Sequence, residues 1–462
     1  MSRQLACCLL LSAACLNGAE REPQVQTLQP GMRLTLIAEH PDLVTPTGID
    51  VDRDGHVWLV ASHTHFPPDN YPGPKHDEIL IFDPDGRRHV FYNATHHTMD
   101  LELGSDGWVY LAERDRILRI KDSDGDGQAD LEETLATLAS DAVYPHNGLS
   151  GLTWHSNGDL LFGVGENFAK PWTLTGTDKT VYRGTGAGGI FRCRTDGTEL
   201  RRIARGLWNP FGLCVRQDGV IFAVDNDPGE RPPCRLLHIV DGGDYGYQRA
   251  YGQEAHHPFV GWYGQLRGTL PMLHPAGEAP CGVCPLGRGL IVPSWSDHRV
   301  YFYALQPHGA SFTANRIELV QGGRYFRPTG IAFDPSHPHS TTLSWYLNDW
   351  VDGRYQVHGY GRLWKLDVDL PQSTWVGPKE LALPTPEAQL AADLRHGLQE
   401  QSQQQLLRLA GQSDPFVAQA ALAALARTAI DWQPVNVENL AAQDRVQAVL
   451  ALKLAATAKP QP

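Results

Sequence analysis

The chain has 462 residues, a formal net charge of -13 at pH 7 and a pI near 5.8. This length is enough to bury a large core. The acidic balance leaves few cations to neutralise phosphates, which argues against a nucleic-acid partner. The 46 glycines, 33 prolines and 12 tryptophans indicate many short strands joined by tight turns.

Residues 1–19 are typical of a secretory signal. Arg3 precedes an apolar stretch, 5–16, that is too short to cross a bilayer and is followed by small residues. We therefore expect an exported protein, periplasmic or extracellular. The stretch "LSAAC" resembles a lipoprotein cleavage box, so a lipid anchor at Cys15 is an alternative. No later segment has an apolar run long enough to predict a transmembrane span.

A repeated pattern follows: an alternating apolar run, a turn and a second apolar run, as in "TGIDVDRDGHVWLVAS" and "FGLCVRQDGVIFAVDND". The pattern begins at residues 48, 100, 151, 212, 282 and 330. Glycine can adopt the positive φ of a tight hairpin turn. Five of the six units carry a glycine seven positions after the start: Gly55, Gly107, Gly158, Gly219 and Gly289.

Units of this length, each holding about four short strands, are typical of propeller blades. We predict an all-β fold, a six-bladed β-propeller over 30–370, with 361–370 as its last strand. A β-sandwich is the competing all-β fold, but it does not require the same hairpin six times. After a linker at 371–384, residues 385–462 are rich in Ala, Leu and Gln, with a helix start at Asp414-Pro415. This predicts a small α-helical segment that resembles the start of a HEAT-like array and packs on the propeller or continues.

The two ends of each inner hairpin return to the same face of the propeller, because antiparallel partners run back to where they began. Polar, charged and aromatic residues gather at these ends, which predicts a binding site at the central mouth. The alternative is that strand ends are polar simply because they meet water. The mouth candidates include His65, His146, Glu166, Asn167, Trp208, Asn209, Asn226, Asp227, Glu278, Arg327, Asp349 and Trp350.

Stretches such as "SHTHFPPDNYPGPKHDEILIF", "GLWNPFGL", "VDNDPGERPPCRLLHIVDGGDYGYQRAYG" and "NDWVDGRYQVHGYGRLWKL" carry a family resemblance over most of 30–370. The chain resembles the soluble quinoprotein sugar dehydrogenases, also called glucose/sorbosone dehydrogenases. It is more similar still to the N-terminal propeller domain of the "membrane-bound dehydrogenase" proteins of planctomycetes. In that family HEAT-like helices commonly follow the propeller.

The resemblance implies oxidation of a sugar or alcohol by pyrroloquinoline quinone, with electrons passed to a separate carrier such as a cytochrome c. His146 matches the family's catalytic base and Arg327 a cofactor-binding arginine. The family pattern Arg-Asn-Pro is Trp208-Asn209-Pro210 here, and an indole could stack on a flat quinone. Other cofactor-contacting candidates are Glu166, Asn167, Asp227 and Asp349.

Two other functions remain open. The propeller could be a non-catalytic module that binds glycan or partner proteins. It could also be a calcium-dependent lactonase-type hydrolase, with Glu166, Asn209, Asp227 and Asp349 as axial ligands.

The segment "DSDGDGQADLEE" matches an EF-hand calcium loop, with Asp122, Asp124 and Asp126 at the first ligand positions and Glu133 at the last. The residues before it alternate like a strand, so a helix–loop–helix switch is not expected. We predict a structural Ca2+ loop between the outer strands of the second blade, with Asp130 as an extra ligand. The alternative is a solvated acidic turn without a metal.

Overall fold

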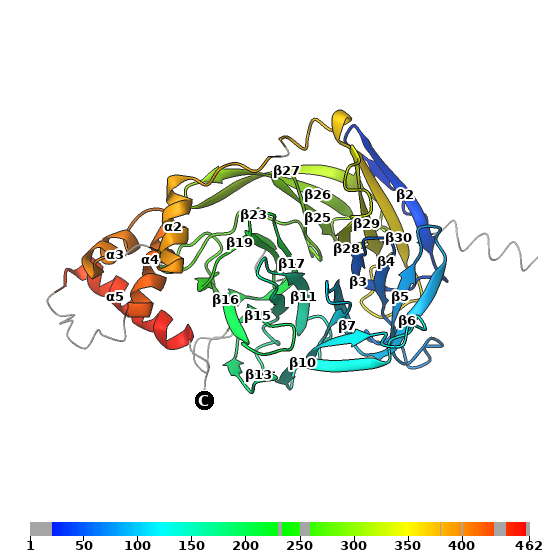
Figure 1. Ribbon diagram of the computed structural model, residues 1–462, viewed down its shortest axis with the longest axis horizontal. Coiled ribbons are helices and arrows are strands. Elements are labelled where there is room, and N and C mark those ends of the chain that lie inside the picture. Colours follow the sequence, from blue (N-terminus) through cyan, green and yellow to red (C-terminus); the bar gives the residue numbers. More distant parts are fainter. Residues whose placement is uncertain are drawn as a thin grey trace, which may run out of the picture.

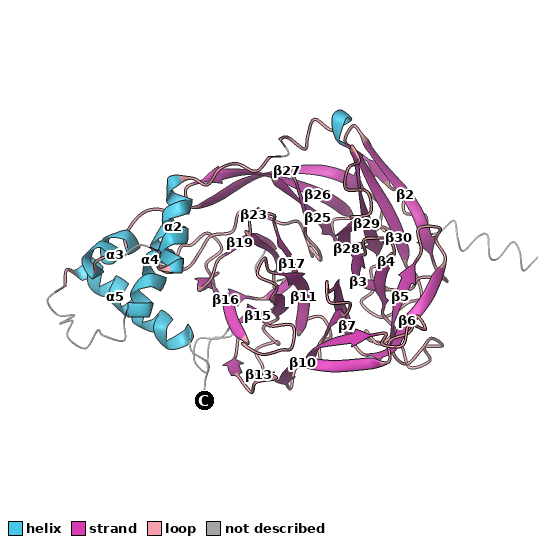
Figure 2. Ribbon diagram, in the orientation of Figure 1, coloured by secondary structure: helices cyan, strands magenta, loops and turns pink. Residues whose placement is uncertain are grey.

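Six sheets surround a central axis in the computed structural model of the chain, and helices lie at one side of the ring (Figure 1; Figure 2). This arrangement confirms the predicted six-bladed propeller and excludes the sandwich. The structure describes residues 21–229, 233–249, 259–378, 380–398, 401–428 and 440–458. The predicted signal, 1–19, and Cys15 lie outside the described residues. Within the described part, none of the helices has the length and apolar character needed to span a bilayer.

In each of the first three blades, the strands follow one another in chain order from the axis outward. Blade one contains β3 (Pro46–Val51), β4 (Val57–Ala61), β5 (Asp77–Phe82) and β6 (Arg88–Thr95). Blade two contains β7 (Thr98–Leu103), β8 (Val109–Glu113), β9 (Arg116–Lys121) and β10 (Leu131–Ser140), extended by β13 (Trp172–Gly176) and β14 (Val181–Gly184). Blade three contains β11 (Leu149–Trp154), β12 (Leu160–Val164), β15 (Gly188–Cys193), β16 (Arg201–Leu207) and the short β20 (Gly243–Asp244).

The other three blades complete the ring. Blade four contains β17 (Asn209–Val215), β18 (Ile221–Asn226), β19 (Arg235–Ile239) and β23 (His274–Pro275). Blade five contains β24 (Cys284–Leu286), β25 (Gly289–Ser294), β26 (Arg299–His308), β27 (Ser311–Gln321) and β1 (Gln26–Thr27). Blade six contains β28 (Pro328–Phe333), β29 (Thr342–Asp349), β30 (Arg362–Asp369) and β2 (Met32–Glu39). A separate ribbon pairs β21 (Tyr247–Gln248) with β22 (Phe259–Val260).

The ring is closed by the N-terminal strand β2, which pairs antiparallel with β30 from Met32 opposite Val368 to Glu39 opposite Arg362. The sequence predicted β30 as the last strand, but not that the outermost strand of blade six comes from the other end of the propeller. Because β2 leads directly into β3 of blade one, this pairing ties the first blade to the last and covers the edge that β30 would otherwise expose.

Hairpin turns support the repeat with one exception. Gly55, Gly107, Gly158 and Gly219 adopt φ between +79° and +89°, as expected for tight turns. The expectation for Gly289 was wrong: Gly289 begins β25, and the positive φ of +54° in that turn belongs to Gly287. Gly289 is required for a different reason, since a Cβ there would lie 2.3 Å from the Phe302 ring.

Side chains of the innermost strands join neighbouring blades. Asp50 of β3 accepts a hydrogen bond from the Leu103 amide at 2.9 Å, and Asp100 of β7 accepts one from the Leu152 amide at 2.8 Å. Burial raises the pKa of Asp50 to about 6 and that of Asp100 to about 7. These bonds fix the angle between successive blades and so help to fix the geometry of the axial channel.

After the short 3-10 helix η1 (Leu370–Gln372), the chain forms four α-helices. They are α2 (Pro386–His396), α3 (Gln403–Ala410), α4 (Pro415–Thr428) and α5 (Ala442–Ala458). Thr385 and Ser402 cap the first two: each side-chain oxygen accepts a hydrogen bond from an amide in the first turn. The predicted helix start at Asp414-Pro415 is correct, since Asp414 accepts hydrogen bonds from the Phe416 and Val417 amides.

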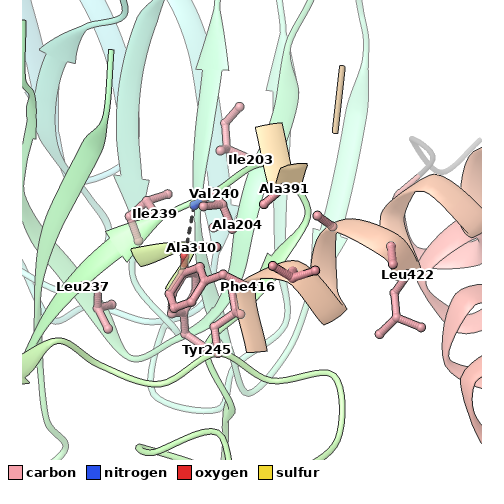
Figure 3. Close-up of a cluster of buried hydrophobic side chains, with 14 of the residues drawn as sticks. Ile203, Ala204, Leu237, Ile239, Val240, Tyr245, Ala310, Ala391, Phe416 and Leu422 are labelled. Carbon is pink, nitrogen blue, oxygen red and sulfur yellow. Dashed lines mark hydrogen bonds between the residues drawn. The ribbon is translucent and has the colours of Figure 1, made fainter. Parts of the chain in front are cut away.

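The helices share a hydrophobic core with blades three and four (Figure 3). Phe416 of α4 stacks on the buried His238 of β19, with ring centroids 5.0 Å apart. Ile203 of β16 and Ile239 of β19 belong to the same buried cluster as Ala391 of α2 and Leu422 of α4. The predicted packing of the helical segment on the propeller is thus confirmed, whereas its likeness to HEAT repeats stays a prediction.

Candidate functional site

A cavity of about 340 Å³ opens at the mouth of the axial channel. Residues from the ends of the inner strands line it, as the hairpin argument predicts, and residues of the connecting loops complete it. Seven of its lining residues are aromatic: Tyr144, Phe168, Trp208, Phe211, Trp295, Trp350 and Tyr355. Its polar lining includes His65, His146, Asn209, Asn226, Asp227 and Glu278.

The candidate base His146 belongs to a chain of hydrogen bonds that fixes its tautomer. His65 Nδ1 lies 2.6 Å from the Tyr355 carbonyl oxygen, and His65 Nε2 lies 2.8 Å from His146 Nδ1. Burial lowers the pKa of His65 to about 4 and holds the pKa of His146 well below its usual value, so both rings are neutral at pH 7.

A carbonyl oxygen only accepts, so His65 must donate from Nδ1, and its Nε2 carries the lone pair. His146 therefore donates from Nδ1 to His65, which leaves the Nε2 of His146 as a hydrogen-bond acceptor. This orientation suits a residue that accepts a hydroxyl proton from a bound ligand.

The Trp208-Asn209 pair is held by a fully buried ion pair behind it. Asp225 accepts a hydrogen bond from the Asn209 amide at 2.8 Å, and Arg235 Nη2 lies 2.6 Å from Asp225 Oδ2. Asn209 Nδ2 in turn donates to the His146 carbonyl at 2.7 Å. The ion pair thus positions both an aromatic wall of the cavity and the backbone of the candidate base.

Arg327, the predicted cofactor-binding arginine, does not line the cavity. Its guanidinium lies over the Trp295 ring, 4.1 Å from the centroid, and Trp295 in turn stacks on Tyr355 at 5.3 Å. Trp295 therefore separates Arg327 from the cavity. The Arg327 Nε atom is buried and has no hydrogen-bond partner among the described residues.

The structure places three other predicted cofactor residues in supporting positions rather than on the cavity wall. Glu166 accepts a hydrogen bond from the Ala169 amide, and Asn167 accepts one from Arg114 Nη2 at 3.1 Å. Asp349 accepts hydrogen bonds from the Arg327 and Val351 amides and from the Trp364 indole. Of the predicted cofactor set, only Trp208, Asn209 and Asp227 line the cavity.

The acidic loop lies between β9 and β10 of blade two, away from the mouth, as predicted. Ligand oxygens of Asp122, Asp124 and Asp126 lie within 4.8 Å of one another. The other two predicted ligands are engaged elsewhere. Asp130 accepts hydrogen bonds from Ser123 at 2.7 Å and 2.6 Å. Glu133 forms an ion pair with Arg119 at 2.6 Å.

The fold and the mouth cavity together define a six-bladed β-propeller with a cavity at one end of its axis. Residues 20–250, half of the chain, match the family described as a domain of unknown function, DUF7133. The chain belongs to this family. No curated protein matches the sequence.

Three solved structures show the same fold. The match to the PQQ-bound aldose sugar dehydrogenase of Streptomyces coelicolor covers 75% of this chain and 99% of that chain, at 17% identity and a TM-score of 0.52. An oxidoreductase of Thermus thermophilus, described as a glucose dehydrogenase, gives 73% and 100% coverage, 19% identity and a TM-score of 0.53. The match to the holo PQQ domain of pyranose dehydrogenase from Coprinopsis cinerea covers 75% of this chain and 97% of that chain, at 14% identity and a TM-score of 0.51.

The cavity wall does not fit pyrroloquinoline quinone in the described arrangement. The quinone carries several carboxylates, which need cations or many donors when buried. Among the described lining residues there is no Lys or Arg, and two carboxylates, Asp227 and Glu278, face the space instead. The arginines beside it are engaged: Arg114 with Asn167 and Arg327 with Trp295.

Sequence reasoning missed several wall residues on the connecting loops. Tyr144 and Phe168 follow no strand-end rule, and Tyr355 reaches the cavity from the loop between β29 and β30. Tyr355 lies between His146 and Trp295, with ring centroids 5.3 Å from each. The one signal for Tyr355 was the aromatic content of the segment "NDWVDGRYQVHGYG", and no comparable signal marked Tyr144 or Phe168.

Proposed function

We propose that the chain binds a neutral sugar or related polyol in the mouth cavity. The observation that carries this proposal is the composition of the wall, which combines seven aromatic rings with Asp227 and Glu278 and, among the described residues, no cation. Aromatic faces pack against the C–H faces of a sugar ring, and carboxylate oxygens accept hydrogen bonds from its hydroxyls. The cavity volume lies within the range of small-molecule sites.

His146 gives the site a polar end suited to a hydroxyl group. Its neutral ring presents Nε2 as an acceptor, and burial keeps it neutral at pH 7. A ligand hydroxyl that donates to Nε2 is oriented by the same chain that runs through His65 to the Tyr355 carbonyl. His146 is therefore the residue that we propose to contact the reactive or recognised hydroxyl.

A titration of intrinsic tryptophan fluorescence with a panel of neutral mono- and disaccharides tests the proposal. Trp208→Ala removes one aromatic wall and should weaken binding about tenfold, in line with about 0.5–1.5 kcal/mol per aromatic contact plus lost burial. Trp108→Ala is the matched control, because Trp108 lies in the blade-two turn outside the cavity lining and should leave the affinity unchanged. No saturable response to any sugar would contradict the proposal.

A second candidate function, oxidation of a sugar or alcohol with a quinone cofactor, is favoured by the fold and by the position of Arg327. The buried Nε of Arg327 has no hydrogen-bond partner in the described part of the chain, and the guanidinium lies behind the Trp295 indole. If Trp295 swings out, Arg327 could meet a cofactor carboxylate, and the chain would be a dehydrogenase of sugars or alcohols that passes electrons to a separate carrier such as a cytochrome c. Dye-linked activity with added quinone and Ca2+, increased by Trp295→Ala and lost in Arg327→Ala, would support this candidate.

We also propose that the chain is exported to the periplasm or the cell exterior. The support is the N-terminal charge and apolar pattern, with Cys15 as an alternative lipid-attachment site. Fractionation of cells expressing the full chain, with labelling by a lipid precursor, separates the soluble and anchored forms.

A further inference from the structure

Three potential metal ligands meet on one wall of the mouth cavity. Oxygens of Asp227 and Glu278 and the sulfur of Cys234 all lie within 4.8 Å of one another. They come from adjacent strand ends of blade four. Asp227 follows β18, Cys234 precedes β19 and Glu278 follows β23. Asp227 and Cys234 are buried and Glu278 is exposed, so the group has both a sheltered side and an open one.

The fold positions Asp227, Cys234 and the backbone of Glu278 before any metal ion binds. The Asp227 amide donates to the Cys234 sulfur at 3.3 Å, and that thiol lies 3.5 Å from Asp227 Oδ2. The Glu278 backbone is fixed by Ser294, whose hydroxyl accepts from the Glu278 amide at 3.0 Å and donates to the Glu278 carbonyl at 2.9 Å. The buried side chains of Asp227 and Cys234, which contact each other, therefore lose little conformational entropy when an ion binds.

A fourth polar atom on the same cavity lacks a partner. Asn209 is 1% exposed, and its Oδ1 accepts no hydrogen bond from the described residues. Asn209 lies opposite Asn226, the residue before Asp227, in the β17–β18 pairing. An unsatisfied buried oxygen is costly unless a ligand or water completes it.

We propose that Asp227, Cys234 and Glu278 bind a divalent transition-metal ion of the zinc class, with an open coordination position facing the cavity. Three protein ligands and one open position are the arrangement of catalytic rather than structural zinc sites. In a tetrahedral zinc site the ligand atoms lie about 2.0–2.3 Å from the ion and therefore about 3.3–3.8 Å from one another. The present group lies within 4.8 Å, so rotation of the exposed Glu278 side chain can close it around an ion.

The sulfur ligand decides the class of metal. A thiolate is a soft donor that favours zinc-like ions, whereas Ca2+ and Mg2+ take oxygen ligands. The thiol must lose its proton as the sulfur–metal bond forms, and the proton passes to solvent. Binding therefore releases one proton per ion from Cys234, and the affinity falls as the pH falls.

The open position gives the metal a role at the sugar site: a ligand hydroxyl could bind the ion there while other hydroxyls meet the aromatic wall. This role rests on the sugar-binding function proposed above, but metal binding itself does not. The acidic wall that disfavours the anionic quinone attracts a cation.

Titration of the chelator-treated full chain with Co2+ tests the site. Cobalt bound to a thiolate gives a charge-transfer band in the near ultraviolet, and we expect one equivalent that Zn2+ displaces. Cys234→Ser should abolish the band. Cys281→Ser is the matched control, because Cys281 also lines the cavity but does not belong to the ligand group, and it should keep the band. Glu278→Gln, an exposed change, should weaken cobalt binding about tenfold.

The sulfur band distinguishes this site from the other two ligand groups in the described chain, Asp52/Asp54/His56 and Asp122/Asp124/Asp126, since neither contains sulfur. Absence of the band in the unmodified chain, or its persistence in Cys234→Ser, would overturn the proposal. Trp208→Ala separates the two proposals: it should lose sugar affinity and keep the cobalt band. A chain that binds sugars without the band would refute the metal site alone.

Discussion

Replacing His65 with Asn perturbs the hydrogen-bond chain behind the candidate base. His65 is 3% exposed, and burial lowers its pKa from 6.5 to about 4. Between these two pH values the unfolded chain carries a proton on His65 and the folded chain does not. The unfolded state therefore binds more protons, and stability falls as the pH falls from 6.5 toward 4.

The magnitude follows from the two pKa values. Going from pH 7 to pH 4.5, the linkage of His65 alone lowers the free energy of unfolding by about 2 kcal/mol. Asn does not titrate, so His65→Asn should lose about 2 kcal/mol less than the unmodified chain over the same interval. At pH 7 the variant should be less stable by about 1 kcal/mol, because Asn is too short to keep the hydrogen bond to His146.

Urea unfolding followed by tryptophan fluorescence at pH 7 and pH 4.5 measures both values for each protein. His339→Asn is the control, since His339 is exposed on the loop before β29 and should behave as the unmodified chain. Equal losses of stability in the unmodified chain and in His65→Asn would refute the neutral imidazole pair, and with it the acceptor role of His146 Nε2.

Three further predictions concern the scaffold. If the acidic loop binds Ca2+, the ion should raise the melting temperature and EDTA should reverse the rise, whereas Asp122→Asn should respond to neither; an unchanged melting temperature in EDTA contradicts the assignment. Asp414→Ala removes the cap of α4 and its hydrogen bond to the Ala310 amide, so the free energy of unfolding, measured in urea by circular dichroism, should fall by about 1–2 kcal/mol. The control is Gln404→Ala, an exposed and uncharged position in α3, which should leave that free energy unchanged. Arg235→Met leaves Asp225 buried without its ion-pair partner and should lower the free energy of unfolding by about 3–5 kcal/mol. Adding Asp225→Leu to the same chain should restore most of that free energy. No recovery in the double variant would mean that the loss comes from packing and not from the unpaired charge.

The blade repeat was predictable because it is local. Each hairpin brings together residues within one short segment, and alternation plus a turn glycine specify it. The mouth face was predictable for the same reason, so His65, His146, Trp208 and Asn209 all lie where the hairpin argument places them. Ring closure by β2 was not predictable, because β2 and β30 lie at opposite ends of the propeller sequence and share no local signal.

The direction in which a side chain points was the second feature that could not be predicted from the sequence. Arg327 directly precedes β28 at the mouth, but its guanidinium lies over Trp295 of blade five instead of in the cavity. Glu133 satisfies the calcium-loop pattern, yet Arg119 on the neighbouring strand engages it. In both cases the competing contact comes from a residue that the motif does not include.

Calorimetric titration of one preparation with a neutral sugar from the fluorescence panel and, separately, with pyrroloquinoline quinone tests the central claim most directly. Because the wall offers aromatic rings and carboxylates, with no cation among its described residues, we predict saturable binding of the sugar and none of the quinone. Saturable binding of the quinone, with no heat from the sugar, would contradict this account of the cavity.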